Sequence, residues 1–195
     1  PILPTGDVDG ARWISHTTAQ FLGPRMIEVG RKFRELRLPL AQRYGIENRL
    51  NRVTANPRDA WIGFVATGFT YFEMLEAFRR IGLDGLAAIE AAGIRLLHLR
   101  MPVPFNPELI RSFSEGLDEI VVVEEKNPTL EWLIKDALYN RGHHPRVLGK
   151  TDEHGATLMR SWGQLDADAI CAGLRSRLSE RVGDRLALHP PPSPE

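Results

Sequence analysis

The stretch that decides the fold is Glu119-Ile120-Val121-Val122-Val123-Glu124-Glu125-Lys126-Asn127-Pro128. Four consecutive β-branched residues lie between charged ends, with no polar residue among them. Such a run predicts a strand that is buried on both faces, as in the middle of a parallel sheet. The strand ends at Glu124, Glu125 and Lys126, and Asn127-Pro128 then opens a helical pattern. Because ligands and partners bind at the carboxyl ends of central strands in open α/β sheets, these three charged residues are candidates for function.

Strand and helix patterns alternate on both sides of this stretch. Strands are predicted at 51–55, 61–67, 94–99, 120–123 and 145–149, and helices at 70–81, 86–92, 107–115 and 128–141. Asn106 and Asn127, each followed by a proline, are expected to cap the helices at 107–115 and 128–141, and Asp166 to cap a last helix. This alternation implies right-handed crossovers and a mostly parallel sheet with helices on both faces. Asn56-Pro57-Arg58-Asp59 is a turn signal, so the first strand is expected to be an antiparallel edge joined to the second by a tight hairpin. The sequence therefore predicts a three-layer α/β/α sandwich around five strands.

The two ends of the chain read differently from this middle part. Residues 1–30 show no clean periodicity and read as an extended arm with one short helix, and 31–50 are helical, with a break near Leu38 where Pro39 opens the next helix. The proline-rich end should be extended or disordered. We therefore expect an arm over 1–50, the α/β domain over 51–183 and a tail over 184–195. Because no Met starts the chain, we expect it to be cut from something longer.

Composition and cysteine usage narrow the class of protein. Basic and acidic side chains balance to a net charge of zero, which argues against a nucleic-acid binder. No apolar run is long enough to span a membrane. Cys171 is the single cysteine, so this chain alone cannot form an internal disulfide or hold an iron–sulfur cluster. A reducing, cytoplasmic compartment is the default, and Cys171 is expected to be a buried, inert thiol in a helix.

The junction Thr67-Gly68-Phe69-Thr70 between a strand and a helix has two interpretations. It could be a backbone nest at a helix N-terminus that takes a phosphate or a carboxylate. It could instead be a tight turn with a capping box, in which Thr70 caps the helix and Glu73 reaches back to it. The sequence has neither a GxGxxG nor a Walker A motif here, which favours the capping box.

The other polar clusters remain open or point to ordinary surface. Glu124-Glu125-Lys126 could supply a general acid or base, could form an ion-pair latch to another domain, or could be a solvated strand end, and the residues alone do not decide. His143-His144 and Asp152-Glu153-His154 have metal-binding residue types without metal-binding spacing, so surface loops are favoured. No Ser-His-Asp arrangement or nucleophile elbow can be argued. We predict no catalytic residue and no metal ligand in this chain.

A set of motifs makes the segment from about Leu38 to Leu178 similar to the middle part of fused indolepyruvate ferredoxin oxidoreductases. These are members of the thiamine-diphosphate-dependent 2-oxoacid:ferredoxin oxidoreductases. The Gly116–Lys126 and Ala137–Asn140 runs are specific in combination. The motifs that carry the resemblance are Leu38-Pro39, Ala66-Thr67-Gly68 through Tyr71, Gly116-Leu117-Asp118-Glu119-Ile120-Val121-Val122-Val123-Glu124-Glu125-Lys126, Ala137-Leu138-Tyr139-Asn140, and Gly149-Lys150 with Asp152-Glu153 and Gly155.

The resemblance implies the transketolase C-terminal fold, a five-stranded sheet whose first strand is antiparallel. It also implies a homo-oligomeric parent that oxidatively decarboxylates aryl pyruvates to acyl-CoA, with coenzyme A as acyl acceptor and ferredoxin as electron acceptor. Thiamine diphosphate, Mg²⁺ and iron–sulfur clusters would lie in other parts of that parent, and none would be bound by this domain alone. One departure is Phe69, because the family often has lysine there.

This domain would then be a structural, docking part of the enzyme that contacts the thiamine-binding domains and is not itself catalytic. The residues expected at the interface or ligand edge are Gly68, Thr70, Tyr71, Glu124, Glu125 and Lys126. The alternative is a freestanding α/β binding module that takes a small anion or a protein partner at the strand carboxyl ends.

Overall fold

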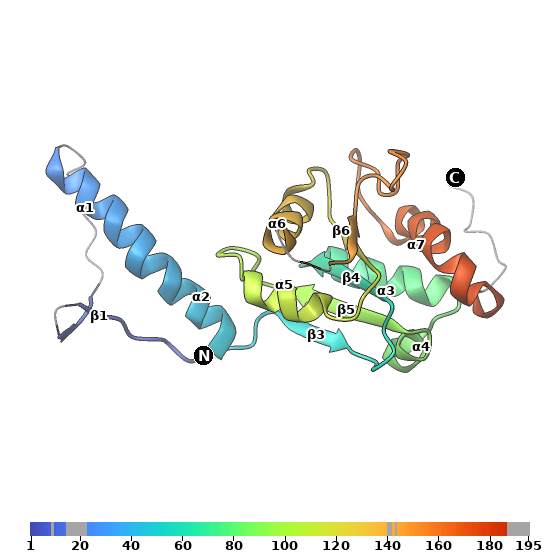
Figure 1. Cartoon of the computed structure of the whole chain (residues 1–195), viewed down its shortest axis with the longest axis horizontal. Coiled ribbons are helices and arrows are strands. Elements are labelled where there is room, and N and C mark those ends of the chain that lie inside the picture. The colour runs from blue at the N-terminus through green and yellow to red at the C-terminus, as the bar shows by residue number, and fades with distance from the viewer. Residues whose placement is uncertain (9, 15–22, 140–141, 143, 187–195) are drawn as a thin grey trace.

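A five-stranded sheet forms the centre of the protein (Figure 1), which we describe from a computed structural model over residues 1–8, 10–14, 23–139, 142 and 144–186. The strand order is β3-β5-β4-β6-β7. Neighbouring strands are parallel, except that the edge strand β3 runs antiparallel to β5. The expected mostly parallel sheet with an antiparallel edge strand is therefore confirmed. The strands are β3 Arg52–Ala55, β4 Ile62–Thr67, β5 Ile94–Leu99, β6 Glu119–Val123 and β7 Arg146–Leu148.

The strand β6, which contains the run of β-branched residues, lies between β4 and β7. All five of its residues are buried, as the absence of polar alternation predicts. Its register places Gly63 of β4 beside Ile120, and Ala66 beside Val123. The carboxyl ends of β4 and β6 therefore meet at one edge of the sheet.

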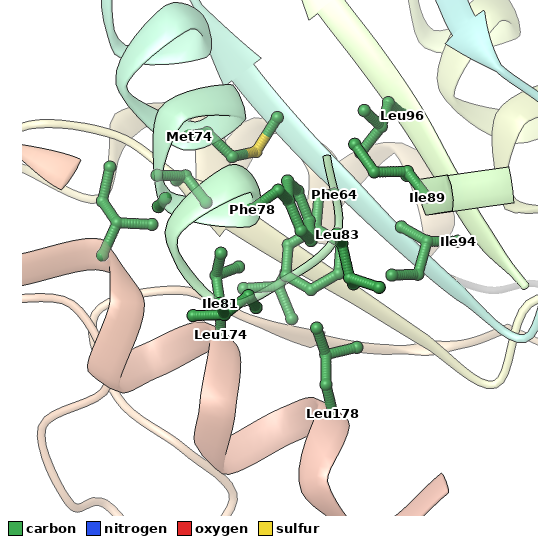
Figure 2. Close-up of a cluster of buried hydrophobic side chains, with 14 of the residues drawn as sticks. Phe64, Met74, Phe78, Ile81, Leu83, Ile89, Ile94, Leu96, Leu174 and Leu178 are labelled. Atoms are coloured by element: carbon green, nitrogen blue, oxygen red, sulfur yellow. The ribbon is translucent and has the colours of Figure 1, made fainter. Parts of the chain in front are cut away.

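Helices cover both faces of the sheet and complete three layers. On one face α3 (Thr70–Arg80), α4 (Gly85–Ala91) and α7 (Ala167–Val182) pack over a large apolar core, part of which is drawn in Figure 2. Within this core the rings of Phe64 and Phe78 meet edge to face, with centroids 5.2 Å apart. On the other face α5 (Pro107–Ser114) and α6 (Thr129–Leu138) cover a second core. Cys171 is buried beside α3, as expected, and burial raises the pKa of its thiol.

Two predicted helix caps are confirmed. The side chain of Asn106 accepts the N–H of Leu109 at 3.3 Å, and that of Asp166 accepts the N–H of Ala169 at 3.0 Å. The capping box at α3 is wrong, because Thr70 makes no cap hydrogen bond and the Glu73 carboxylate accepts the backbone N–H of Ala167 instead, at 2.8 Å. Packing of α7 against α3 brings that amide within reach of Glu73. Tertiary contact thus replaced a local cap.

The hairpin predicted between the first two strands of the sheet is also wrong. β3 pairs with β5, not with β4, so the turn at 56–59 does not join paired strands. The segment after the turn passes the start of β5 instead, where Trp61 donates its backbone N–H to the Gly93 carbonyl at 3.0 Å and its indole N–H to the Ala92 carbonyl at 3.1 Å. A short connection predicts that the two strands it joins are neighbours in the sheet. Here β5 lies between β3 and β4 instead.

The N-terminal helix stands beside the sheet as a rod (Figure 1). It consists of α1 (Pro24–Lys32), a π-helical turn η1 (Phe33–Arg37) and α2 (Leu38–Glu47). The break expected near Leu38 is wrong, because the N–H of Leu38 bonds the carbonyl of Phe33 and the helix continues through the wider turn. A π-turn rearranges the hydrogen bonds around Pro39, which has no N–H to give. A short hairpin of β1 (Asp7–Val8) and β2 (Ala11–Arg12), which the sequence did not predict, precedes the helix.

The last element of the described chain is a 3-10 turn, η2 (Gly183–Arg185), which follows α7. Among the described residues, no helix combines the length and apolar character that crossing a bilayer requires. The residues placed in the structure contain no group of three or more His, Cys, Asp or Glu side chains that could hold a metal ion. Asn140, His143 and the proline-rich end lie outside the described residues.

Candidate functional site at the carboxyl ends of the central strands

The predicted site residues lie where β4 and β6 end side by side. The chain leaves β4 for α3 on one face of the sheet and leaves β6 for α6 on the other face. Diverging connections of this kind form the crevice at which open α/β sheets bind ligands or partners. The sequence therefore placed Gly68–Tyr71 and Glu124–Lys126 at one common edge, which the pairing of Ala66 with Val123 brings together.

Glu124 is directed into the protein. Its side chain accepts the backbone N–H groups of Leu130 at 2.9 Å and Glu131 at 3.0 Å, so each carboxylate oxygen caps the first turn of α6. The residue is only 8% exposed. Burial raises the pKa of Glu124, and the two N–H groups and Lys150 oppose that rise. This carboxylate replaces the cap expected from Asn127, because α6 begins at Thr129 without a side-chain cap of its own.

Lys150 and Glu131 complete the surroundings of Glu124. The Lys150 ammonium donates to the backbone carbonyl of Glu124 and, at 3.3 Å, to that of Arg160. The Glu131 carboxylate accepts the backbone N–H of Lys150 at 3.0 Å and pairs with Lys135 at 2.6 Å. A Cβ at position 149 would collide with the Glu131 carboxylate, so this close approach needs Gly149. Burial lowers the pKa of the Lys150 ammonium, and nearby carboxylates oppose that shift.

Glu125 and Lys126 are exposed, and both hold the loop that follows β7. The Glu125 carboxylate accepts the backbone N–H of Leu165 at 3.3 Å, and the Lys126 ammonium donates to the carbonyl of Gly163 at 3.4 Å. Lys126 adopts a left-handed backbone conformation, with φ of 54°. Such a conformation is uncommon for a residue with a long side chain. The three charged residues thus join β6, α6 and the loop over 150–165.

The β4 side of the edge is formed by backbone and aromatic groups. The N–H of Gly68 donates to the carbonyl of Leu99 at 3.3 Å, which occupies one donor of the predicted anion nest. Thr70 is half-buried at the start of α3. Tyr71 is buried, with its hydroxyl 2.7 Å from the Thr54 hydroxyl. Burial raises the pKa of the Tyr71 phenol, and the hydrogen bond to Thr54 opposes the rise.

His98 is the neighbour that sequence reasoning missed. Its ring stacks on Tyr71, with centroids 4.0 Å apart and planes within 4° of parallel, and the edge of Phe72 approaches it. The residue is 5% exposed, and its Nε2 has no partner among the described residues. Burial, reinforced by Arg100, lowers the pKa of His98, which favours the neutral ring. A histidine one residue before the end of a predicted buried strand was the available signal.

The chemistry of this edge suits docking better than proton transfer. Both oxygens of Glu124 are occupied by backbone donors, and Tyr71 is turned inward. The exposed side chains are the aromatic residues Phe69, which is 68% exposed, Phe72 and Trp162, together with Glu125 and Lys126. Exposed aromatic side chains of this size are the groups that interfaces bury.

Comparison with known proteins gives a consistent family. A family model described as "Indolepyruvate oxidoreductase domain" matches residues 51–189. The chain is 30% identical over 94 residues to indolepyruvate oxidoreductase subunit IorA of Pyrococcus abyssi, which covers 48% of this chain and 13% of that protein. It is 29% identical over 133 residues to the IorA subunit of Thermococcus kodakarensis, which covers 65% of this chain and 19% of that protein.

The same comparisons include solved structures. The 2-oxoglutarate:ferredoxin oxidoreductase from Magnetococcus marinus aligns over 80% of this chain and 24% of its own, with a TM-score of 0.49 and 13% identity. The chain thus corresponds to only 13 to 19% of the length of the two IorA relatives. The family match covers most of the chain, including the whole five-stranded sheet. The chain therefore belongs to the indolepyruvate oxidoreductase domain family.

Proposed function

We propose that this chain is a structural, docking domain of an indolepyruvate-type 2-oxoacid:ferredoxin oxidoreductase. The parent enzyme would decarboxylate aryl pyruvates oxidatively to acyl-CoA, with coenzyme A as acyl acceptor and ferredoxin as electron acceptor. The observation that carries the docking role is the division of the site, whose charged groups are occupied within the domain while its aromatic groups reach the surface. The domain would occupy 51–183, with 1–50 as an arm.

The residues of this chain do not fit the iron–sulfur clusters of such a parent. Iron–sulfur clusters need several thiolates, and Cys171 is a single, buried thiol with a raised pKa. In this proposal thiamine diphosphate, Mg²⁺ and the clusters belong to other parts of a homo-oligomeric, cytoplasmic parent, and no step of the reaction is assigned to this chain.

The candidate interface is the edge formed by Gly68, Thr70, Tyr71, Glu124, Glu125 and Lys126, with the thiamine-binding domains as partners. The buried residues Glu124 and Tyr71 would hold the elements of this edge in place, and the exposed residues Lys126 and Phe69 would contact the partner. The alternative of a freestanding module that binds a small anion is less favoured, because the N–H of Gly68 is already bonded to the Leu99 carbonyl.

The docking role is tested by a matched pair of variants in the intact enzyme. Phe69→Asp should lower the rate of aryl pyruvate oxidation about tenfold, because a carboxylate would be buried at a central interface position. Leu86→Asp is the control, since Leu86 is exposed on α4, which precedes the amino end of β5. Both variants should keep the unfolding midpoint of the isolated chain. Equal activity of the two variants would contradict the docking role.

A second measurement tests the non-catalytic assignment. Calorimetric titration of the isolated chain with thiamine diphosphate and Mg²⁺ should detect no binding with a dissociation constant in the micromolar range. Micromolar binding would instead require a cofactor site within this chain and would overturn the assignment.

A further inference from the structure

The N-terminal helix carries an apolar stripe that the described chain covers only in part. Met26, Val29, Phe33, Leu36 and Leu40 recur at spacings of three and four, which places them on one side of the helix. At the far end of the rod Met26 is 56% exposed and Phe33 is 44% exposed. None of the residues of α1 is buried.

The half of the stripe nearer the sheet is covered by an extended segment of the same chain. A Cβ at Gly6 would lie 2.9 Å from a Leu36 methyl and 3.0 Å from a Leu40 methyl, so the backbone there passes directly over the stripe. Asn48 fixes that segment, because its side chain accepts the N–H and donates to the carbonyl of Ile2, both at 2.7 Å. One half of the stripe thus holds a polypeptide segment, and the other half, around Phe33, is left uncovered by the residues that the structure describes.

The charges around the open half are mainly basic, because residues 24–37 carry five basic and two acidic side chains. Lys32 is paired with Glu28 at 2.7 Å, and Arg31 is paired with Glu35 at 3.2 Å. Arg34 and Arg37 belong to the π-helical turn that begins at Phe33, and the Arg37 guanidinium lies 5.9 Å from the centre of the Phe33 ring. An apolar stripe with an excess of basic side chains beside it is complementary to an apolar strip bordered by carboxylates.

We propose that residues 24–37 dock onto a polypeptide surface that presents an apolar strip bordered by carboxylates. A second copy of this helix does not suit the stripe, because pairing would bring together two segments that each carry an excess of three basic side chains over 24–37. A lipid surface does not suit it either, because the open stripe offers only Met26 and Phe33 as large exposed apolar groups. The proposal concerns the arm alone and stands whether or not the α/β domain docks through its strand ends.

Photo-crosslinking of the intact protein in its native assembly tests the proposal. p-Benzoylphenylalanine replaces Phe33 on the stripe in one sample and Ile27, which is 75% exposed and lies off the stripe, in the control. Position 33 should crosslink to an acidic polypeptide segment outside residues 1–50, with a yield several times that of position 27. Arg34→Glu/Arg37→Glu should lower the yield about tenfold, whereas Arg34→Lys/Arg37→Lys should keep it within about twofold.

Several results would overturn the proposal. These are crosslinks from position 33 to helix 24–37 of a second copy, to residues 1–50 of the same chain or to lipid, and equal yields from positions 27 and 33. An unchanged yield in the charge-reversed variant would also overturn it, because Arg34 and Arg37 would then have no role in docking. Circular dichroism of each variant confirms that the helix is retained, and Arg34→Gln/Arg37→Gln, which should give an intermediate yield, serves as the second variant if charge reversal unfolds it.

Discussion

Glu124 is the residue at which the strand end, the following helix and the loop after β7 meet. Its carboxylate accepts two backbone N–H groups of α6, and its carbonyl accepts the Lys150 ammonium. A charged residue at the end of a buried strand can be solvated, catalytic or structural, and here both oxygens are used within the domain. The carboxylate also lies at the positive end of the α6 dipole, which stabilises its ionised form.

Removing the Glu124 carboxylate should destabilise the domain. Glu124→Ala leaves the N–H groups of Leu130 and Glu131 without their acceptor, so the free energy of unfolding should fall by about 2–3 kcal/mol. Glu124→Gln keeps one acceptor oxygen and should lose about half as much. Urea denaturation of the two variants and the parent chain measures both values. An alanine variant as stable as the parent would contradict this account of the carboxylate.

The raised pKa of Glu124 predicts how the contribution of this residue to the stability of the folded chain changes with pH. Since the folded pKa lies above the unfolded value of 4.5, the folded state holds the proton more tightly, and stability falls as pH rises through the interval between the two values. The stability of the parent chain relative to Glu124→Gln should therefore be greater at pH 4 than at pH 7. Urea denaturation of both proteins at the two pH values measures the difference. The opposite order would show that the N–H groups outweigh burial.

At the scale of elements, α3 and α7 are joined by a side chain that was expected to act locally. Glu73 lies in the first turn of α3, but its carboxylate accepts the N–H of Ala167 at the start of α7. Asp166 caps α7 through the N–H of Ala169, so two carboxylates serve the start of that helix. The positive end of the helix dipole favours negative charge there.

Glu73→Ala should therefore destabilise the packing of α7 on α3 by about 1–2 kcal/mol, because the Ala167 N–H loses a charged acceptor. Glu76→Ala is the matched control one turn along the same helix. Glu76 pairs with Arg79 and Arg80 near the surface, and its removal should cost less than about 1 kcal/mol. Thermal unfolding followed by circular dichroism compares the two. A larger loss for Glu76→Ala would disprove the link between the helices.

At the scale of the whole molecule, an ion-pair network joins the start of β6 to the last helix. Glu119 is buried, and Arg177 of α7 donates to it with two nitrogens, one of them at 2.8 Å. Arg177 also pairs with Glu153 at 2.8 Å, and Arg146 of β7 lies 3.5 Å from Glu119. The hydrogen bonds to Glu119 raise the pKa of the Arg177 guanidinium. The network fixes residues far apart in sequence at the amino edge of the sheet.

Arg177→Ala should lower the free energy of unfolding by about 3 kcal/mol, because it leaves the buried Glu119 carboxylate without its main partner. Arg181→Ala, one turn further along α7, is the control. Arg181 pairs with the exposed Asp118 at 2.8 Å and lies over the Trp61 ring at 4.5 Å, so its loss should cost about 1 kcal/mol or less. Urea denaturation distinguishes the two variants, and equal losses would mean that the buried pair gives no special stability.

The sequence by itself determined the class of fold, because hydrophobic periodicity is a local property. The unbroken run at Ile120–Val123 identified a buried central strand. The alternation of strands and helices identified a mostly parallel sheet that is covered by helices on both faces. Asn106 and Asp166 were found as caps because the backbone N–H groups that donate to them lie three residues away. The candidate edge could also be located from the sequence, since the carboxyl ends of parallel strands share one side of the sheet.

Only the tertiary structure decided which partner each polar group takes. Glu73 bonds an amide ninety-four positions away, and Glu124, not Asn127, caps α6, because backbone donors from other elements were brought within reach. The place of β3 beside β5 was likewise set by contacts across the sheet and not by the length of the turn before β4. Packing also turned Tyr71 inward against His98. Periodicity records which face of an element is buried, whereas hydrogen-bond partners depend on distances that only the assembled chain defines.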